Sequence, residues 1–391
     1  MIQWFVIVLS VLLPIIILPI LLPTLILMAK RKRIIDAPNY RKTQQRPVSL
    51  MGGMLVVCVM VVSLSIASIY VPLNDLFPAM CMVVLLMTIG LIDDSIDLSF
   101  YVKFVIQVIV VLILCFAGPY RITSLWTVFG IETLPLGWAC VLSVLAGVAI
   151  MNAINFLDGI DGLTAVYGMF VGVVMTVWGI HHHEFSHAIL SLIIASSMFA
   201  FGIFNGFASR YKIYLGDSGS LVLGLYVYLS VCKILSHRIP QAHLSNGYEV
   251  AFVVSLLAVP LFDSMRVIVG RIVKGKSPFK GDRTHLHHVL VDLGYTHLTA
   301  CLLIILINIF VFMCWGFLVE WKATHTMHLG VICLISAFSV FSPYYQLNYI
   351  KCRHPERYER YQLRVRRHRM KYAHRHQLVT RVIDNIPTII R

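Results

Sequence analysis

The sequence predicts an all-α membrane protein, a bundle of about eleven transmembrane helices. Of its 391 residues, 59% are hydrophobic and only 13% are charged, and the mean hydropathy is +0.83. This composition leaves too few charged side chains to cover the surface of a soluble protein of this size. Apolar windows of about 20 residues, long enough to cross a bilayer as a helix, recur along nearly the whole chain. They are continuous rather than alternating, which favours helices over the strands of a barrel.

Each expected span is an apolar window bounded by polar or turn-forming residues. The windows lie near 3–29, 54–71, 77–92, 102–117, 137–153, 163–180, 187–207, 219–235, 248–269, 299–318 and 328–350. The first is too long for a cleavable signal and its basic cluster follows it, so we expect a retained span. Residues 1–350 should form a single transmembrane domain, and residues 351–391 a basic tail.

The charge distribution predicts the orientation of the chain. The net charge is +14, and nearly all of the 32 Lys and Arg residues fall in segments that share one side if the N-terminus is outside. The positive-inside rule then places the C-terminus in the cytoplasm. Topology therefore explains the basic composition, and no nucleic-acid partner is required. The nine cysteines are scattered without a CxxC pair, so neither a metal cluster nor a disulfide is predicted.

The stretch 152–163 is the most polar interruption between two apolar windows. Amides and carboxylates recur there at every third position, at Asn152, Asn155, Asp158 and Asp161. Polar side chains at the end of a membrane helix are costly and mark functional sites by default. A ligand or metal site is therefore favoured over a simple capping turn.

A second acidic group follows the third window, at Asp93, Asp94 and Asp97. Adjacent carboxylates repel each other, so a cation must offset them, either a divalent ion or a lysine. Lys103 begins the next window and could reach back to this group. The pattern is typical of a divalent-metal or diphosphate site, and a solvated loop is the alternative.

A third acidic site contains Asp217, which stands between Gly216 and Gly219 at the expected start of a helix. The N–H groups of a helix N-terminus suit phosphate, and the carboxylate can hold the ion that accompanies it. The alternative is an ordinary Asp N-cap.

The loop after the ninth window combines basic residues with three histidines. Arg283 is followed by His285, His287 and His288. The histidines could form a zinc site or donate hydrogen bonds to a diphosphate and a sugar. We favour the second, because the acids elsewhere imply a hard ion that prefers oxygen ligands.

Asp263 lies inside the ninth window, three residues before Arg266. Residues at this spacing share a helix face. We therefore interpret Asp263 as half of a structural ion pair. The basic tail, rich in aromatic residues, is typical of an amphipathic segment on anionic headgroups.

All of the main polar clusters fall on the expected cytoplasmic side. This arrangement favours an enzyme that acts between a soluble nucleotide substrate and a lipid head. A carrier would more often place polar residues at mid-membrane and repeat them in two halves. A carrier of a phosphorylated or nucleotide sugar remains the competing class.

Taken together, the motifs resemble those of the polyprenyl-phosphate N-acetylhexosamine-1-phosphate transferases. In chain order they are Asp93-Asp94-x-x-Asp97, Asn152-x-x-Asn155-x-x-Asp158-Gly-x-Asp161-Gly, Gly216-Asp217-x-Gly219-Ser220 and His285-Leu286-His287-His288. The resemblance covers roughly residues 30 to 300. The His-x-His-His form looks like the bacterial undecaprenyl-phosphate N-acetylglucosamine-1-phosphate transferases, whereas the muramoyl-pentapeptide branch carries three consecutive histidines.

The resemblance implies a reaction at a bacterial inner membrane. N-acetylglucosamine 1-phosphate would pass from UDP-N-acetylglucosamine to undecaprenyl phosphate, releasing UMP and starting an envelope glycan such as lipopolysaccharide. It implies Mg²⁺ as cofactor, with Mn²⁺ as a potential substitute, and is compatible with a homodimer. Other N-acetylhexosamine transferases of the family, the muramoyl-pentapeptide enzyme included, stay open as alternatives.

The resemblance also implies a role for each motif residue. Asp217 and Asn155 would hold the metal, while Asp93 and Asp94 would lie at the reacting phosphates. The remaining catalytic residues would be Asp158 and Asp161, which position the nucleotide, and His285, His287 and His288, which contact the diphosphate and the sugar. Further substrate contacts would come from Lys103, Asn152, Asp97 and Arg283.

Overall fold

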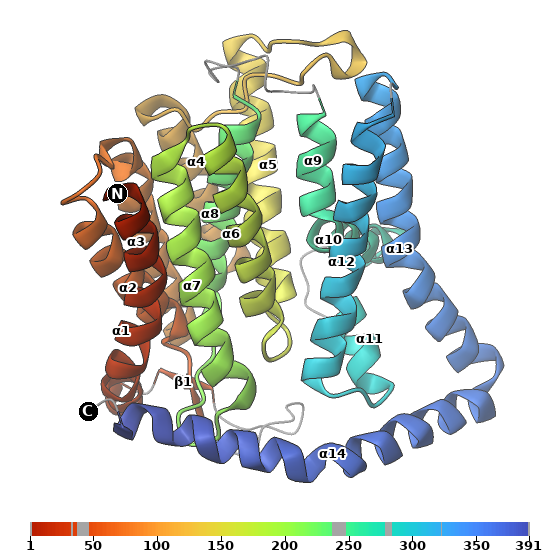
Figure 1. Ribbon diagram of the computed structural model, residues 1–391. Helices are drawn as coiled ribbons and strands as arrows, with labels where there is room; N and C mark the ends of the chain where they lie inside the picture. The colour runs from red at the N-terminus through yellow and green to blue at the C-terminus, as the bar shows by residue number, and fades with distance from the viewer. Residues whose placement is uncertain are drawn as a thin grey trace. The chain divides into compact units, whose positions relative to one another are not determined.

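The computed structural model describes residues 2–32, 34–36, 47–236, 248–277, 284–321 and 323–389 (Figure 1). Its helices are α1 (Ile2–Lys32), α2 (Gly52–Ala67), α3 (Phe77–Ile96), α4 (Phe100–Ala117), α5 (Leu136–Leu157), α6 (Leu163–His181), α7 (Phe185–Phe207), α8 (Gly216–Ile234), α9 (Glu249–Leu256), α10 (Ala258–Val273), α11 (Leu286–Asp292), α12 (His297–Val319), α13 (His325–Arg353) and α14 (Pro355–Ile389). Short 3₁₀ turns are η1 (Asn74–Leu76) and η2 (Val128–Gly130). Within these ranges, regular β-structure is limited to strands β1 (Ile35–Asp36) and β2 (Val48–Ser49), paired antiparallel. The predicted helical class is therefore confirmed, with a minor β-ladder added.

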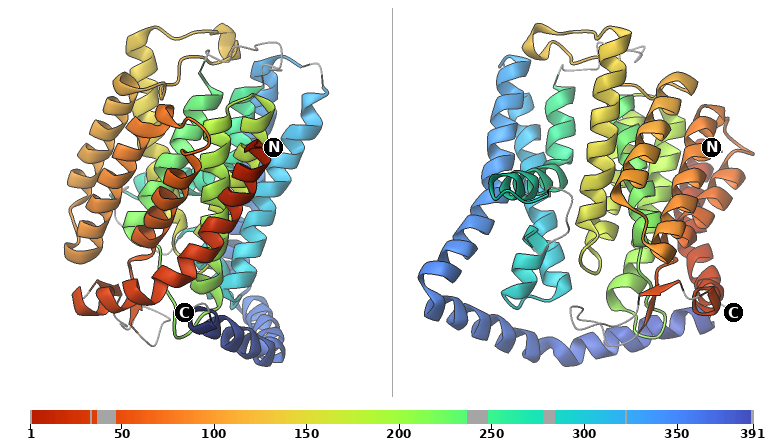
Figure 2. Two further views of the ribbon diagram at one scale, coloured as in Figure 1. Left: turned by 60° about the vertical axis from the view of Figure 1, so that its left-hand side comes forward. Right: turned by 180° about the vertical axis from the view of Figure 1, so that it is seen from behind.

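In the described part of the chain, nine helices are long and apolar enough to cross a membrane, or ten if the bent pair α9–α10 is one span. The protein is thus a multi-pass membrane protein. The expectation of about eleven full spans was too high for two reasons. The helix expected near 54–71 is α2, with only 16 residues, and the window near 248–269 is bent by 71° between α9 and α10 (Figure 2).

A proline and an asparagine explain the bend. Pro260 has no N–H, so the carbonyl of Leu256 loses its helical donor. The side chain of Asn308 on α12 replaces it, donating Nδ2–H to Leu256 O at 3.0 Å and accepting the Val259 N–H at Oδ1, also 3.0 Å. A broken helix is tolerated in a membrane only when its freed backbone groups are satisfied in this way.

Chain contacts divide the protein into two compact units. Unit 1 comprises residues 1–110, 164–227 and 374–391, and unit 2 comprises 111–163 and 228–373. In unit 1, α1 and α2 pack on each other and on α7. In unit 2, α9, α12 and α13 share a small apolar core, and α12 and α13 run side by side (Figure 1). The predicted division at residue 350 stays a prediction.

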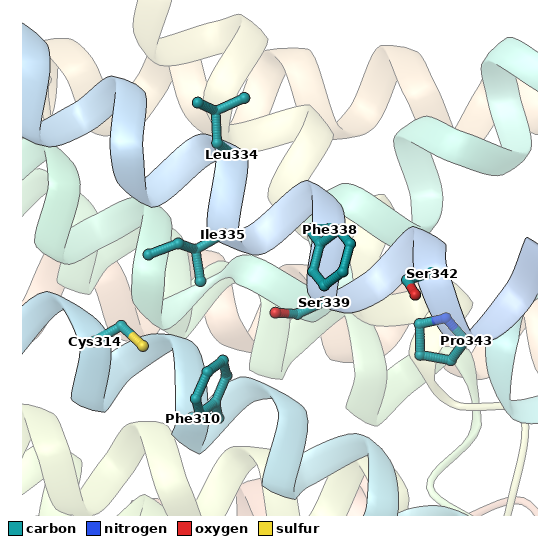
Figure 3. A pocket seen from close by; sticks show the side chains of 8 residues that line it. All are labelled: Phe310, Cys314, Leu334, Ile335, Phe338, Ser339, Ser342 and Pro343. Carbon is teal, nitrogen blue, oxygen red and sulfur yellow. The ribbon is translucent and has the colours of Figure 1, made fainter.

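An apolar cavity of about 490 Å³ lies between α12 and α13 (Figure 3). Its lining consists of Phe310, Cys314, Leu334, Ile335, Phe338, Ser339, Ser342 and Pro343. The lining contains no ionisable group other than a thiol, so this cavity suits an apolar chain and not phosphate chemistry.

Candidate active site

In unit 1, Lys103 of α4 joins two of the predicted acids. Its Nζ lies 2.8 Å from Asp93 Oδ2 and 3.1 Å from Asp217 Oδ2. The other oxygen of Asp93 accepts the backbone N–H of Leu98 at 2.7 Å. The Asp93 side chain is only 5% exposed, whereas that of Asp217 is 30% exposed. Asp217 is therefore the acid of this pair that remains accessible to a ligand.

Asp94 binds the start of α8 rather than the lysine. Its Oδ1 accepts the N–H of Asp217 at 2.9 Å and its Oδ2 that of Ser218 at 3.3 Å. These are N–H groups that have no acceptor within the helix itself. Gly90, one turn earlier on α3, permits this contact, because a Cβ there would lie 2.3 Å from Ser218 Cα. Asp94 thus fixes the start of α8, which carries Asp217. Its carboxylate also occupies N–H groups that the sequence analysis expected to bind phosphate.

Replacing Asp94 with alanine should destabilise the protein. Two hydrogen bonds are lost and two N–H groups at the helix start lose their acceptor, at a cost of roughly 1–3 kcal/mol each. We expect a lower midpoint of thermal unfolding in detergent. Ser95→Ala is the matched control, because the Ser95 side chain is exposed and its hydroxyl donates to Leu91 O of the same helix. Equal midpoints for the two variants would contradict the anchoring role.

In unit 2, the four polar residues of 152–161 divide between a helix and a loop. Asn152 and Asn155 lie in the last turns of α5, which ends at Leu157. Asn152 donates Nδ2–H to Val148 O at 2.8 Å. Asp158 follows as the cap, and Asp161 Oδ2 lies 2.9 Å from Nδ1 of His297 on α12. The spacing of three is therefore helical only for the two amides.

The histidine motif is anchored by Asp263. The Oδ2 of Asp263 lies 2.9 Å from Nδ1 of His285, and its Oδ1 lies 2.6 Å from Nη2 of Arg266. The N–H of Leu286, the first residue of α11, points at both oxygens at 3.3 Å. Arg266 also donates to Thr284 O at 2.8 Å, and its guanidinium lies over the ring of Tyr344. The expected ion pair is present, but it also orients His285 and the start of α11.

His287 packs against the loop that follows α5. A Cβ on Gly159 would lie 2.0 Å from His287 Nε2, so only glycine fits there. The His287 ring is buried, its Nε2 finds no hydrogen-bond partner among the described residues, and the rings of His285 and His288 flank it. Burial, assisted by the charges of His288 and His285, lowers the pKa of His287 well below its ordinary value. At neutral pH this ring is therefore uncharged.

The lowered pKa of His287 predicts a pH dependence of stability. Because the folded state resists protonation, the stabilisation is complete above the unfolded pKa, about 6.5, and is lost as the pH falls below it. Between pH 7.5 and 5.5 the midpoint of thermal unfolding should fall more for the wild type than for His287→Asn. Parallel curves for the two proteins would contradict the assignment.

Of three further residues, Asp97 and Arg283 were predicted from the sequence and His297 was not. Asp97 ends α3 in a left-handed conformation, with φ = 56°, and its N–H bonds to Asp93 O. Arg283 lies outside the described residues. His297 was not singled out by the sequence, because its partner Asp161 is 136 residues away and no local pattern marks it.

The donor chemistry of the unit 1 cluster suits a hard divalent ion. Two carboxylates contact one ammonium and a third lies beside them at the start of α8, so carboxylates outnumber ammonium groups in this cluster. Among the described residues, no three His, Cys, Asp or Glu side chains gather closely enough to hold a metal by themselves. Mg²⁺ commonly binds through one or two carboxylates together with substrate phosphates, and does not need such a cage. The cluster therefore fits magnesium in charge and ligand type.

Comparison with known proteins extends these observations. The sequence profile of glycosyl transferase family 4 matches residues 76–235. The undecaprenyl-phosphate alpha-N-acetylglucosaminyl 1-phosphate transferase of Escherichia coli strain K12 is 30% identical over 285 residues, 71% of this chain and 75% of the relative. The decaprenyl-phosphate N-acetylglucosaminephosphotransferase of Mycobacterium leprae is 29% identical over 305 residues, 72% of this chain and 75% of the relative.

The fold and the clustered acids define a multi-pass membrane protein with a polar cluster of carboxylates and a lysine in its α3–α4–α8 region. The chain belongs to glycosyl transferase family 4, and within it to the polyprenyl-phosphate N-acetylhexosamine-1-phosphate transferases. The predicted family is thereby confirmed. The individual roles predicted for the site residues stay predictions.

Proposed function

We propose that this protein transfers N-acetylglucosamine 1-phosphate from UDP-N-acetylglucosamine to undecaprenyl phosphate. An oxygen of the lipid phosphate forms a bond to the β-phosphorus, the bond from that phosphorus to the bridging oxygen breaks, and UMP leaves. The observation that carries the proposal is the ammonium of Lys103 held between Asp93 and Asp217. The names of the relatives and the His-x-His-His form support this donor and this acceptor.

Unit 1 would handle the reacting phosphates. We propose that Asp217, the exposed acid, is a magnesium ligand. The resemblance alone adds Asn155 as a second candidate ligand. Bound Mg²⁺ would neutralise charge on the diphosphate and polarise it for attack. Lys103 would add a fixed positive charge beside the phosphates while holding Asp217 in place.

We propose direct attack by the lipid phosphate rather than an enzyme-bound intermediate. The second pKa of a phosphate monoester is near 6, so the nucleophile is already ionised at neutral pH. Both oxygens of Asp93 and both of Asp94 already accept hydrogen bonds, which suits positioning better than nucleophilic attack. A phospho-aspartate trapped after incubation with the nucleotide sugar alone would contradict this mechanism.

Unit 2 would bind the nucleotide sugar. Asp158 and Asp161 would position the nucleotide, and His285, with Nδ1 held by Asp263, can present Nε2 to a phosphate oxygen. We assign His287 and His288 to the diphosphate and the sugar, and Asn152 and Arg283 to further substrate contacts. Asp97, a residue of unit 1, is proposed separately as a substrate contact. By the positive-inside rule we place this chemistry on the cytoplasmic side of a bacterial inner membrane, at the first step of an envelope glycan.

The direct test is UMP release by purified protein in detergent. We expect release to require undecaprenyl phosphate, UDP-N-acetylglucosamine and Mg²⁺, with Mn²⁺ as a partial substitute, and to be lost with chelator and in Asp217→Asn. Release only with UDP-N-acetylmuramoyl-pentapeptide would replace the donor assignment. Protein-dependent vesicle uptake of an unchanged nucleotide sugar, without UMP, would replace the transferase with a carrier.

A further inference from the structure

The C-terminal helix α14 makes contacts that the family comparison does not explain. The profile match ends at residue 235, well before α14 begins at Pro355. In unit 1, the last part of α14 buries Ile383 and Pro387, while Leu378, Val379, Val382 and Ile389 on its other faces stay exposed. This end of the helix therefore docks on unit 1 through one defined face.

Asp384 lies on that docking face and binds three consecutive backbone N–H groups. Its carboxylate accepts from Ser209 at 3.1 and 3.3 Å, from Arg210 at 3.0 and 3.1 Å, and from Tyr211 at 3.4 Å. Successive N–H groups that converge in this way form an anion-binding nest. The nest here is filled by a side chain of the protein itself.

The local backbone explains why the nest needs an acceptor. α7 ends at Phe207, and Ala208 adopts an extended conformation with φ = −73° and ψ = 151°. The N–H groups that follow are turned away from the carbonyls of α7, which can no longer accept them. Without Asp384, the three donors would need water or another acceptor.

The loop that carries the nest leads directly to the metal-binding candidate. Farther along this loop, Ile213 O accepts a hydrogen bond at 2.9 Å from the side chain of Asn205 on α7. The Tyr214 N–H bonds to Ser49 O at 2.8 Å. Gly216 and Asp217 come next, where Asp217 meets Lys103. Asp384 thus fixes the first residues of a short loop whose last residues set the position of the Asp217 carboxylate.

We propose that the C-terminal segment of α14 is a positioning element of the active site, and that Asp384 is its positioning residue. It acts through loop 209–215 on Asp217 and touches no substrate. The catalytic part of this inference rests on the function proposed above, whereas the structural part does not.

The same logic holds separately at the other end of α14, in unit 2. There Gln362 donates Nε2–H to Asp292 O at 2.8 Å, at the last residue of α11. α11 carries His287 and His288. Tyr358, four residues before Gln362 on α14, is buried. Two motif-bearing segments, one in each unit, therefore receive contacts from a helix outside the matched region.

The test uses the full chain in detergent, with Asp384→Ala compared to Asn385→Ala. Asn385 is the next residue, its side chain is exposed, and none of the N–H contacts above involves it. By hydrogen exchange, Asp384→Ala should speed exchange at 209–211 by about tenfold or more and also reduce protection at the Asp217 and Ser218 amides. The control should match the wild type.

The catalytic consequence has its own readout. In Asp384→Ala the magnesium concentration for half-maximal UMP release should rise several-fold and kcat should fall, with the KM for the nucleotide sugar little changed. Asp384→Glu should restore part of both effects, since it keeps the carboxylate.

Two results would overturn the inference. Unchanged exchange at 209–211 in Asp384→Ala would show that Asp384 does not protect these amides. Faster exchange at 209–211 with full protection at 217 and 218 would show that Asp384 does not position Asp217. A wild-type chain that releases no UMP would contradict the proposed function alone, because exchange at 217 and 218 still reports whether Asp384 positions this loop.

Discussion

Lys103→Met should reduce UMP release by about 100- to 1,000-fold, the usual loss when one preorganised charged or polar group is removed from a transition state. Methionine keeps most of the side-chain volume but removes the ammonium that contacts both Asp93 and Asp217. The two carboxylates would then repel each other, and the positive charge that Lys103 is proposed to place beside the phosphates would be lost. The measurement is kcat for UMP release at saturating lipid and nucleotide sugar.

Two further variants separate charge from shape. Lys103→Arg keeps the charge but replaces a compact ammonium with a planar fork, so it should recover only part of the activity. The control is Tyr101→Leu. Tyr101 lies two residues before Lys103 and is 76% exposed, so this substitution should leave kcat unchanged. If Lys103→Met retained more than a tenth of wild-type kcat, the ammonium would not be the group that carries the proposed chemistry.

Hydropathy and spacing could predict the helical fold and most of the polar clusters, because both are local properties of the chain. The pairing of Lys103 with Asp93 was within reach, since Lys103 lies nine residues beyond Asp94 and a short turn joins the two helices. The bend was not predicted, although Pro260 was visible, because a proline breaks a span only where another helix supplies a partner such as Asn308.

Contacts between distant parts of the chain explain what the sequence left unresolved. Asp93 and Asp94 look equivalent in the sequence, yet one binds Lys103 and the other binds the start of α8, because adjacent residues on a helix point in directions about 100° apart. Asp384 carries no motif, and the role proposed for it depends on a loop that begins at Ser209, 175 residues earlier. Such roles follow from three-dimensional packing and not from local pattern.

Gly159→Ala should lower kcat by about 100-fold or more, because a misplacement of about 1 Å at a reacting group can cost that much. The new methyl would lie 2.0 Å from Nε2 and 2.7 Å from Cε1 of His287, so the ring or the loop must move. His287 is buried and flanked by His285 and His288, which leaves the ring little room. The shift would therefore displace either the histidine motif or the neighbouring Asp158.

A matched control and a double variant make this prediction specific. Gly270 lies in α10 of the same unit, and a Cβ there meets nothing within 4 Å, so Gly270→Ala should leave kcat and the unfolding midpoint close to wild type. In Gly159→Ala/His287→Ala the clash is removed, so the unfolding midpoint should recover relative to Gly159→Ala while UMP release stays low. Recovery of both would mean that His287 only packs against the loop. Recovery of neither would show that the strain of Gly159→Ala does not arise from the His287 ring.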